Sequence, residues 1–138
     1  MATHGHFHWN ELATRNLEQA KAFYHDALGW EFQAMPMVPS GTYWLVIDGE
    51  TPVCGFYEME PGDAPGTTDY WTGYIAVDDV DARVAKAVAC GATIVQEPFD
   101  VPEVGRMVVL HEPGGASIAW MTPAAEAGQA VCPATLPT

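Results

Sequence analysis

The feature that most constrains the fold is an internal repeat, because residues 11–24 and 74–87 carry apolar and turn residues in the same order. Each stretch reads as a short strand, a polar turn and an amphipathic helix. A shift of 63 positions aligns Leu12 with Ile75, Asn16 with Asp79 and Leu17 with Val80. Beyond these stretches, after a deletion of one residue, Gly29 aligns with Gly91 and Pro36 with Pro98. A repeated order of structural signals indicates a duplicated supersecondary unit.

Both expected helices carry start and stop signals. Asn16 and Asp79 stand at N-cap positions, where a side-chain oxygen can accept a backbone N–H of the first turn. Gly29 and Gly91 stand where a left-handed C-terminal cap is needed, which a residue without Cβ adopts at little cost. The runs between Pro and Gly turns predict three strands after each helix, at residues 31–35, 43–47, 53–59, 93–96, 106–111 and 116–121.

Each half is therefore expected to be a β-α-β-β-β module, which places the chain in the α+β class. A length of 138 residues suits a single domain, and 49% apolar residues can supply its core. Module one is expected at about residues 7–59, a linker at 60–70, module two at about 71–122 and an aperiodic tail at 123–138.

Charge and cysteine content exclude several classes of function. Five basic residues stand against 18 acidic ones, and a formal net charge of −13 repels nucleic acid and anionic membranes. The same charge would favour a cationic ligand, or would serve solubility alone. Three cysteines without a CxxC spacing predict neither a disulfide framework nor a zinc site. No signal peptide and no membrane-spanning apolar run are recognisable, so we expect a cytoplasmic protein.

A doubled β-α-β-β-β unit resembles the vicinal oxygen chelate superfamily, which comprises glyoxalase, bleomycin-resistance and dioxygenase proteins. The resemblance rests on four short sequence motifs: Ala22-Phe23-Tyr24, Leu28-Gly29-Trp30, Val77-Asp78-Asp79-Val80-Asp81 and Glu112-Pro113-Gly114-Gly115. Within it, residues 9–14 and 71–74 are similar to a glyoxalase-like or hydroxylase-like branch. The resemblance implies curled mixed sheets around a cavity, and a homodimer in which modules pair within one chain or between chains.

The resemblance also implies where metal ligands would stand, on the first and last strands of each module. Counting from the shared motifs leads to Trp9, Thr72 and Ala119, and to Gly55 or Phe56. None of these is a ligand for a divalent metal, which takes His, Asp, Glu or Cys. We therefore predict no metal site and no cofactor. The alternative is a divalent metal held by residues that the counting misses.

Strand alternation predicts the lining of the cavity. If Leu12 and Thr14 face the helix, then Trp9, Glu11 and Ala13 face inward, and by the repeat so do Thr72, Tyr74 and Ala76. Tyr43 or Trp44, and Phe56 or Tyr57, supply one inward aromatic each. The predicted ligand-binding residues are Trp9, Glu11, Trp44, Phe56, Thr72, Tyr74, Ser117, Ala119 and Met121.

Two functions of different classes follow. The first is a binding module that sequesters a flat or cationic small molecule between aromatic walls. The second is an enzyme of the same fold, a lyase, isomerase or hydroxylase-like protein. It would be metal-free with Glu11 as general base, since desolvation raises the pKa of a carboxyl group, or would use an unrecognised metal site. His4, His6 and His8 alternate and could share a strand face that binds a transition metal, or they form a frayed polar terminus.

Overall fold

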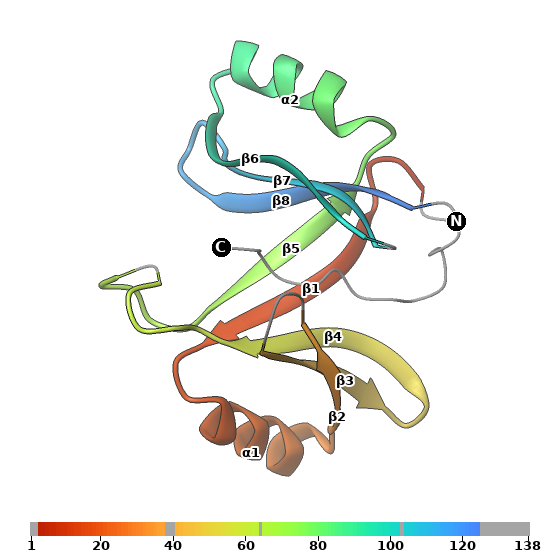
Figure 1. Ribbon diagram of the computed structural model, residues 1–138, viewed down its shortest axis with the longest axis vertical. Coiled ribbons are helices and arrows are strands. Elements are labelled where there is room, and N and C mark those ends of the chain that lie inside the picture. Colours follow the sequence, from red (N-terminus) through yellow and green to blue (C-terminus); the bar gives the residue numbers. More distant parts are fainter. Residues whose placement is uncertain (1–2, 38–40, 64, 103, 125–138) are drawn as a thin grey trace. The chain divides into compact units, whose positions relative to one another are not determined.

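The structure is a computed structural model that describes residues 3–37, 41–63, 65–102 and 104–124. Its elements, labelled in Figure 1, are β1 (Phe7–Thr14), α1 (Leu17–Leu28), β2 (Glu31–Pro36), β3 (Thr42–Asp48), β4 (Thr51–Glu58), β5 (Tyr70–Ala76), α2 (Val80–Ala89), β6 (Thr93–Val101), β7 (Gly105–His111) and β8 (Ser117–Pro123). This order is β-α-β-β-β twice over. The predicted α+β class and its two modules are confirmed.

The described residues form two compact units, one of residues 10–71 and the other of residues 3–9 with 72–124. The segment predicted as a linker lies within the first unit, and most of the predicted tail lies outside the described residues. Neither described helix is long and apolar enough to cross a lipid bilayer.

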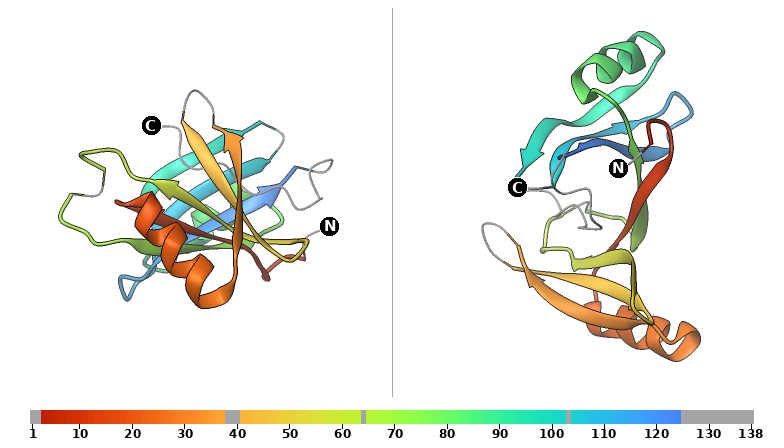
Figure 2. Two further views of the ribbon diagram at one scale, coloured as in Figure 1. Left: turned by 90° about the horizontal axis from the view of Figure 1, so that it is seen from below. Right: turned by 90° about the vertical axis from the view of Figure 1, so that its right-hand side faces the viewer.

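The unit of residues 10–71 is a mixed sheet in the order β2-β3-β4-β1, with α1 lying along one of its faces (Figure 2). β2, β3 and β4 pair antiparallel, while β1 runs parallel to β4. The core between α1 and the sheet contains Leu12, Leu17, Ala20, Val46, Cys54 and Phe56. Burial of such aliphatic and aromatic side chains is the main force that holds the helix on the sheet.

The second unit repeats this plan, with the strand order β5-β8-β7-β6 and a parallel β5–β8 pair. Its core under α2 contains Val77, Val80, Ala87, Val108, Leu110 and Ile118. The N-terminal segment belongs to this unit, because Gly5 N–H donates to the Ala76 carbonyl and Ala76 N–H donates to the His6 carbonyl. The expectation of a frayed terminus is therefore wrong for residues 5 and 6.

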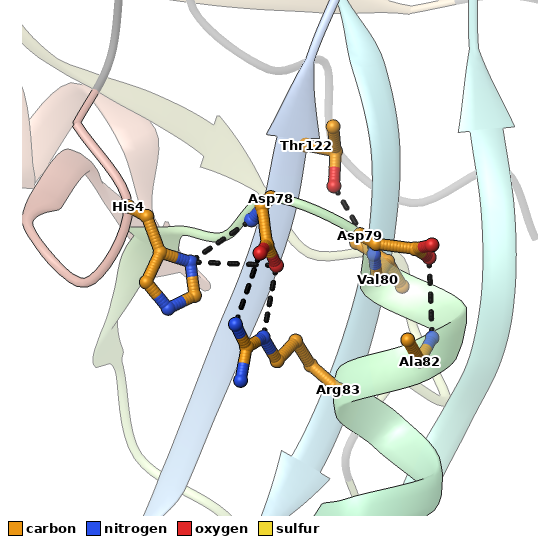
Figure 3. Close-up of polar contacts among 7 residues, drawn as sticks. All are labelled: His4, Asp78, Asp79, Val80, Ala82, Arg83 and Thr122. Carbon is orange, nitrogen blue, oxygen red and sulfur yellow. Dashed lines mark hydrogen bonds and ion pairs between the residues drawn. The ribbon is translucent and has the colours of Figure 1, made fainter.

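The two predicted N-caps and the predicted Gly29 cap are confirmed, whereas the C-cap of α2 is Cys90, with φ of −93°, and Gly91 follows it with φ of 104°. The Asn16 side chain accepts a hydrogen bond from Gln19 N–H at 3.1 Å, and Asp79 accepts one from Ala82 N–H at 3.1 Å (Figure 3). Gly29 closes α1 with φ of 79°, a left-handed conformation that glycine adopts freely. Both helices thus begin where the repeat places their caps, and α2 ends one residue before the position that the repeat predicts.

Pro98 was expected to lie beyond a short strand, yet β6 continues through it to Val101. In the described sheet β6 pairs only with β7, and the β6–β7 register shifts twice, between Ile94 and Gln96 and between Gln96 and Phe99. An edge strand with bulges tolerates a proline, because the missing N–H need not pair.

The segment between β4 and β5 is fastened to the turn that joins β1 to α1. The Arg15 guanidinium donates to the Asp63 carbonyl and to both the carbonyl and hydroxyl oxygens of Thr67. The Asp69 carboxylate accepts from the Thr14 hydroxyl at 2.6 Å and from Arg15 N–H at 3.0 Å. These bonds hold Asp69 in a defined position beside the start of α1.

Candidate functional site

A buried carboxylate, Glu11, lies on β1 in the unit of residues 10–71. Its neighbour Leu12 packs into the core under α1, so strand alternation directs Glu11 and Ala13 to the opposite sheet face. Only 4% of the surface of Glu11 is exposed. A carboxylate removed from water is costly unless polar groups compensate it, which makes this position a candidate for function.

Tyr43 covers the position opposite Glu11. Glu11 is registered with Gly55 on β4, and a Cβ added at Gly55 would overlap the ring and hydroxyl of Tyr43. The Tyr43 ring therefore lies directly on the glycine backbone, where no larger residue fits. Tyr43 is itself buried.

Tyr57 lies on the same face, since it is registered with Ala13 across the parallel β1–β4 pair. Burial, followed by the negative charge of Glu11 and by Tyr70, raises the pKa of Tyr57 far above its usual value. Tyr57 therefore stays a neutral phenol, and it is hydrogen-bonded to Tyr70. The arrangement combines a buried carboxylate with phenol groups within electrostatic reach, and it can bind a polar ligand or transfer a proton.

Trp44 and Phe56 are placed differently from the prediction. Both lie on the face under α1, because Trp44 is registered with Phe56 and Phe56 with Leu12. The choice of these two as inward aromatics is therefore wrong, and the other members of each pair, Tyr43 and Tyr57, face the Glu11 side. Which residues of β4 share a sheet face with Glu11 depends on the register between β1 and β4, and the sequence pattern does not reveal that register.

The remaining predicted residues lie in the unit of residues 3–9 and 72–124. Tyr74 is registered with Ala119, and Ala76 with Met121; all four are buried on the face opposite α2. Trp9 is also buried, Thr72 is half-buried and Ser117 is exposed at the start of β8. Their membership of one ligand site remains a prediction.

Within the described residues, no group of three or more His, Cys, Asp or Glu side chains is arranged to hold a metal ion. His4 is instead part of a polar contact in which its Nδ1 accepts from Asp78 N–H at 3.0 Å (Figure 3). Burial lowers the pKa of His8, and His6 is exposed.

Curated relatives align in sequence with most of this chain. The protein named "Putative glyoxylase CFP32" of Mycobacterium tuberculosis is 40% identical over 116 residues, which cover 84% of this chain and 43% of that protein. "Anthracycline biosynthesis protein DnrV" of Streptomyces peucetius is 34% identical over 116 residues, covering 78% of this chain and 38% of that protein. This chain therefore spans less than half the length of the curated relatives that it matches.

Solved structures share the fold. Methylmalonyl-CoA epimerase of Mycobacterium tuberculosis has a TM-score of 0.60 at 20% identity, covering 93% of this chain and 95% of that one. Mn(II)-bound glyoxalase of Novosphingobium aromaticivorans has a TM-score of 0.56 at 17% identity, covering 88% of this chain and 40% of that one. At these identities the likeness concerns the fold alone.

A family model described as "Glyoxalase/Bleomycin resistance protein/Dioxygenase superfamily" matches residues 5–119. The match covers the first module and most of the second, including the strands that surround Glu11. The chain belongs to the glyoxalase/bleomycin resistance protein/dioxygenase superfamily.

Proposed function

We propose that this protein binds a flat small molecule on the sheet face that carries Glu11, without a metal ion at the counted ligand positions. The observation that carries the proposal is the burial of the Glu11 carboxylate beside Tyr43 and Tyr57. Tyrosine rings offer flat apolar contact together with a hydroxyl group, and the carboxylate supplies one fixed charge. A ligand with a flat ring system and a cationic group matches both.

Two further observations support this ligand class. The net charge of −13 attracts cations and disfavours phosphate-bearing ligands. One relative is named for anthracycline biosynthesis, and anthracyclines are flat fused-ring compounds. We further propose that the protein acts in the cytoplasm as a homodimer, a state that light scattering during gel filtration would detect.

The test is a titration with daunorubicin, a flat amine-bearing anthracycline, and with its uncharged aglycone daunomycinone. Both are followed by quenching of their own fluorescence. If Glu11 pairs with the amine, Glu11→Gln should weaken the binding of daunorubicin about tenfold, because a hydrogen bond to a charged group is lost. The binding of the aglycone should stay almost unchanged. Equal binding of daunorubicin by the wild type, Glu11→Gln and Tyr43→Phe would refute the proposal.

A second candidate is a metal-free enzyme with Glu11 as general base. It is favoured by one observation, the pairing of a buried carboxylate with a neutral phenol at Tyr57. Such a pair can remove a proton next to a carbonyl group and stabilise the resulting oxyanion. Pyruvate and acetoacetate incubated with the protein in D2O should then exchange α-hydrogens, detected by NMR, and Glu11→Gln should abolish the exchange. Unchanged exchange in that variant would exclude Glu11 as the base.

A further inference from the structure

A pocket lies on the other side of the same sheet from Glu11, between α1 and the end of the segment that leads into β5. Its volume is about 460 Å³, and the residues that line it include Leu12, Ala20, Phe23, Tyr24, Asp69 and Trp71. All of these residues belong to the unit of residues 10–71. Leu12 and Glu11 are consecutive on β1 and point to opposite faces, so this pocket is separate from the site proposed above.

The walls of this outer pocket are large aromatic side chains that solvent reaches. Phe23 is 61% exposed and Trp71 is 41% exposed. The Tyr24 ring lies between them in edge-to-face contact, 4.9 Å from Phe23 and 5.9 Å from Trp71 between centroids. Exposed aromatic rings that converge on a concavity mark ligand sites more often than scattered apolar residues do. The volume suits a ligand of two or three fused rings.

The unit that forms the outer pocket carries an excess of negative charge. Residues 10–71 contain ten acidic side chains and only two basic ones, Arg15 and Lys21. The Arg15 guanidinium donates to the main-chain carbonyls of Thr67 and Asp63, and the Lys21 ammonium lies 3.6 Å above the Trp44 ring. Asp69, held by Thr14 and Arg15 N–H, contributes a fixed carboxylate to the wall.

Aromatic faces and a negative field act together on one class of ligand. A ring face attracts a cation through its quadrupole, and the Lys21–Trp44 contact is an example of this interaction in the same unit. A flat ring system can also pack against Phe23 and Trp71 by offset or edge-to-face contact. We propose that the outer pocket is a binding site for flat aromatic cations.

The experiment compares N-methylacridinium, a flat permanent cation, with N-methylacridone, a neutral compound of nearly the same shape. The wild type should bind the cation more tightly, as measured by fluorescence titration at low salt. Phe23→Ala should weaken N-methylacridinium by about fivefold, because one exposed aromatic contact is lost. Leu28→Ala is the matched control, since Leu28 is a similarly exposed residue of α1 (56%) that does not line the pocket.

Asp69→Asn tests the charge while it keeps the side-chain shape. It should weaken N-methylacridinium several-fold and leave N-methylacridone unchanged, with an unaltered circular dichroism spectrum. Phe23→Ala and Asp69→Asn should weaken N-methylacridinium binding by the same factor in the wild type and in the Glu11→Gln background, so failure of the Glu11 proposal and failure of this one are distinguishable. The proposal is overturned if N-methylacridinium does not bind at all, or if Phe23→Ala and Leu28→Ala bind it alike. It is also overturned if only Glu11→Gln reduces binding.

Discussion

Substituting Gly55 tests the close approach of Tyr43 to the sheet beside Glu11. In an ordinary strand, replacing glycine with alanine stabilises the fold by roughly 0.5–1 kcal/mol, because glycine loses more backbone entropy on folding. At Gly55 the new Cβ would overlap both the Tyr43 hydroxyl and its ring carbons. Since Tyr43 is only 3% exposed, its ring cannot swing freely into solvent. Overpacking of this kind costs about 1–3 kcal/mol, so Gly55→Ala should destabilise the protein.

The assay is thermal and urea unfolding followed by circular dichroism. For a chain of this length, about 1–3 kcal/mol corresponds to a melting temperature lower by roughly 4–12 °C. Tyr43→Phe should not relieve the loss, because ring carbons also overlap. Tyr43→Ala, although itself destabilising, should make the further change Gly55→Ala harmless. The coupling between the two substitutions should therefore reach at least about 1 kcal/mol.

Gly73→Ala in β5 is the matched control. Its Cβ would come within 2.9 Å of the ring edge of Phe7, whose side chain is 66% exposed and can move, and would make an ordinary contact with Ile118 at 3.6 Å. We expect Gly73→Ala to change stability by less than about 1 kcal/mol in either direction. If Gly55→Ala stabilises the protein, or if Tyr43→Ala does not suppress its effect, then Tyr43 does not lie on the Gly55 backbone and the proposed geometry of the Glu11 site is wrong.

Three other predictions concern single contacts. Asn16→Ala should lower the free energy of unfolding by about 1 kcal/mol in urea, because it removes the cap on Gln19 N–H, while Asn16→Asp should retain stability. The hydrogen bonds from Arg83 lower the pKa of Asp78 to about 2. The stability that they contribute is therefore complete above the unfolded pKa near 3.8 and is lost as the pH falls toward 2. Carbon-13 NMR of the Asp78 carboxyl group should show this low midpoint, and Arg83→Gln should raise it. Glu11→Gln should lower the pKa of Tyr57 by removing a nearby negative charge, although burial still keeps that pKa above its usual value. NMR of ring-labelled tyrosine would measure the change, and an unchanged pKa would contradict the proximity of Glu11 to Tyr57.

Local signals in the sequence predicted the element order and the helix caps. Asn16, Asp79 and Gly29 act on backbone groups within a few residues of themselves, so their roles can be recognised without knowledge of the rest of the fold. The exposed ends of the helices were less predictable. The spacing of Leu28 and Val88 along their helices would place both on the buried face. They lie in the last helical turns, however, and both are exposed.

The candidate site was only partly predictable, because it depends on pairing between distant strands. Glu11 was identified from its alternation with Leu12 on a single strand. Trp44 and Phe56 were assigned to the wrong face because the parallel register of β4 against β1 decides their direction. The bonds that fix Asp69 to Thr14 and Arg15 span more than 50 positions, and no periodic pattern indicates them.

The assignment of residues 3–9 to the second unit has a consequence for synthesis on the ribosome. Gly5 and His6 leave the ribosome before their backbone partner Ala76, which is translated some 70 residues later. The parallel partner of β5, strand β8, comes later still. Strands β2, β3 and β4 and most of β1 lie within residues 10–71, so their mutual pairing needs no residue translated after position 71. Residues 5 and 6 therefore lack this backbone partner until residue 76 has left the ribosome, and slow translation of the residues up to 76 would lengthen their exposure to proteases and to neighbouring nascent chains.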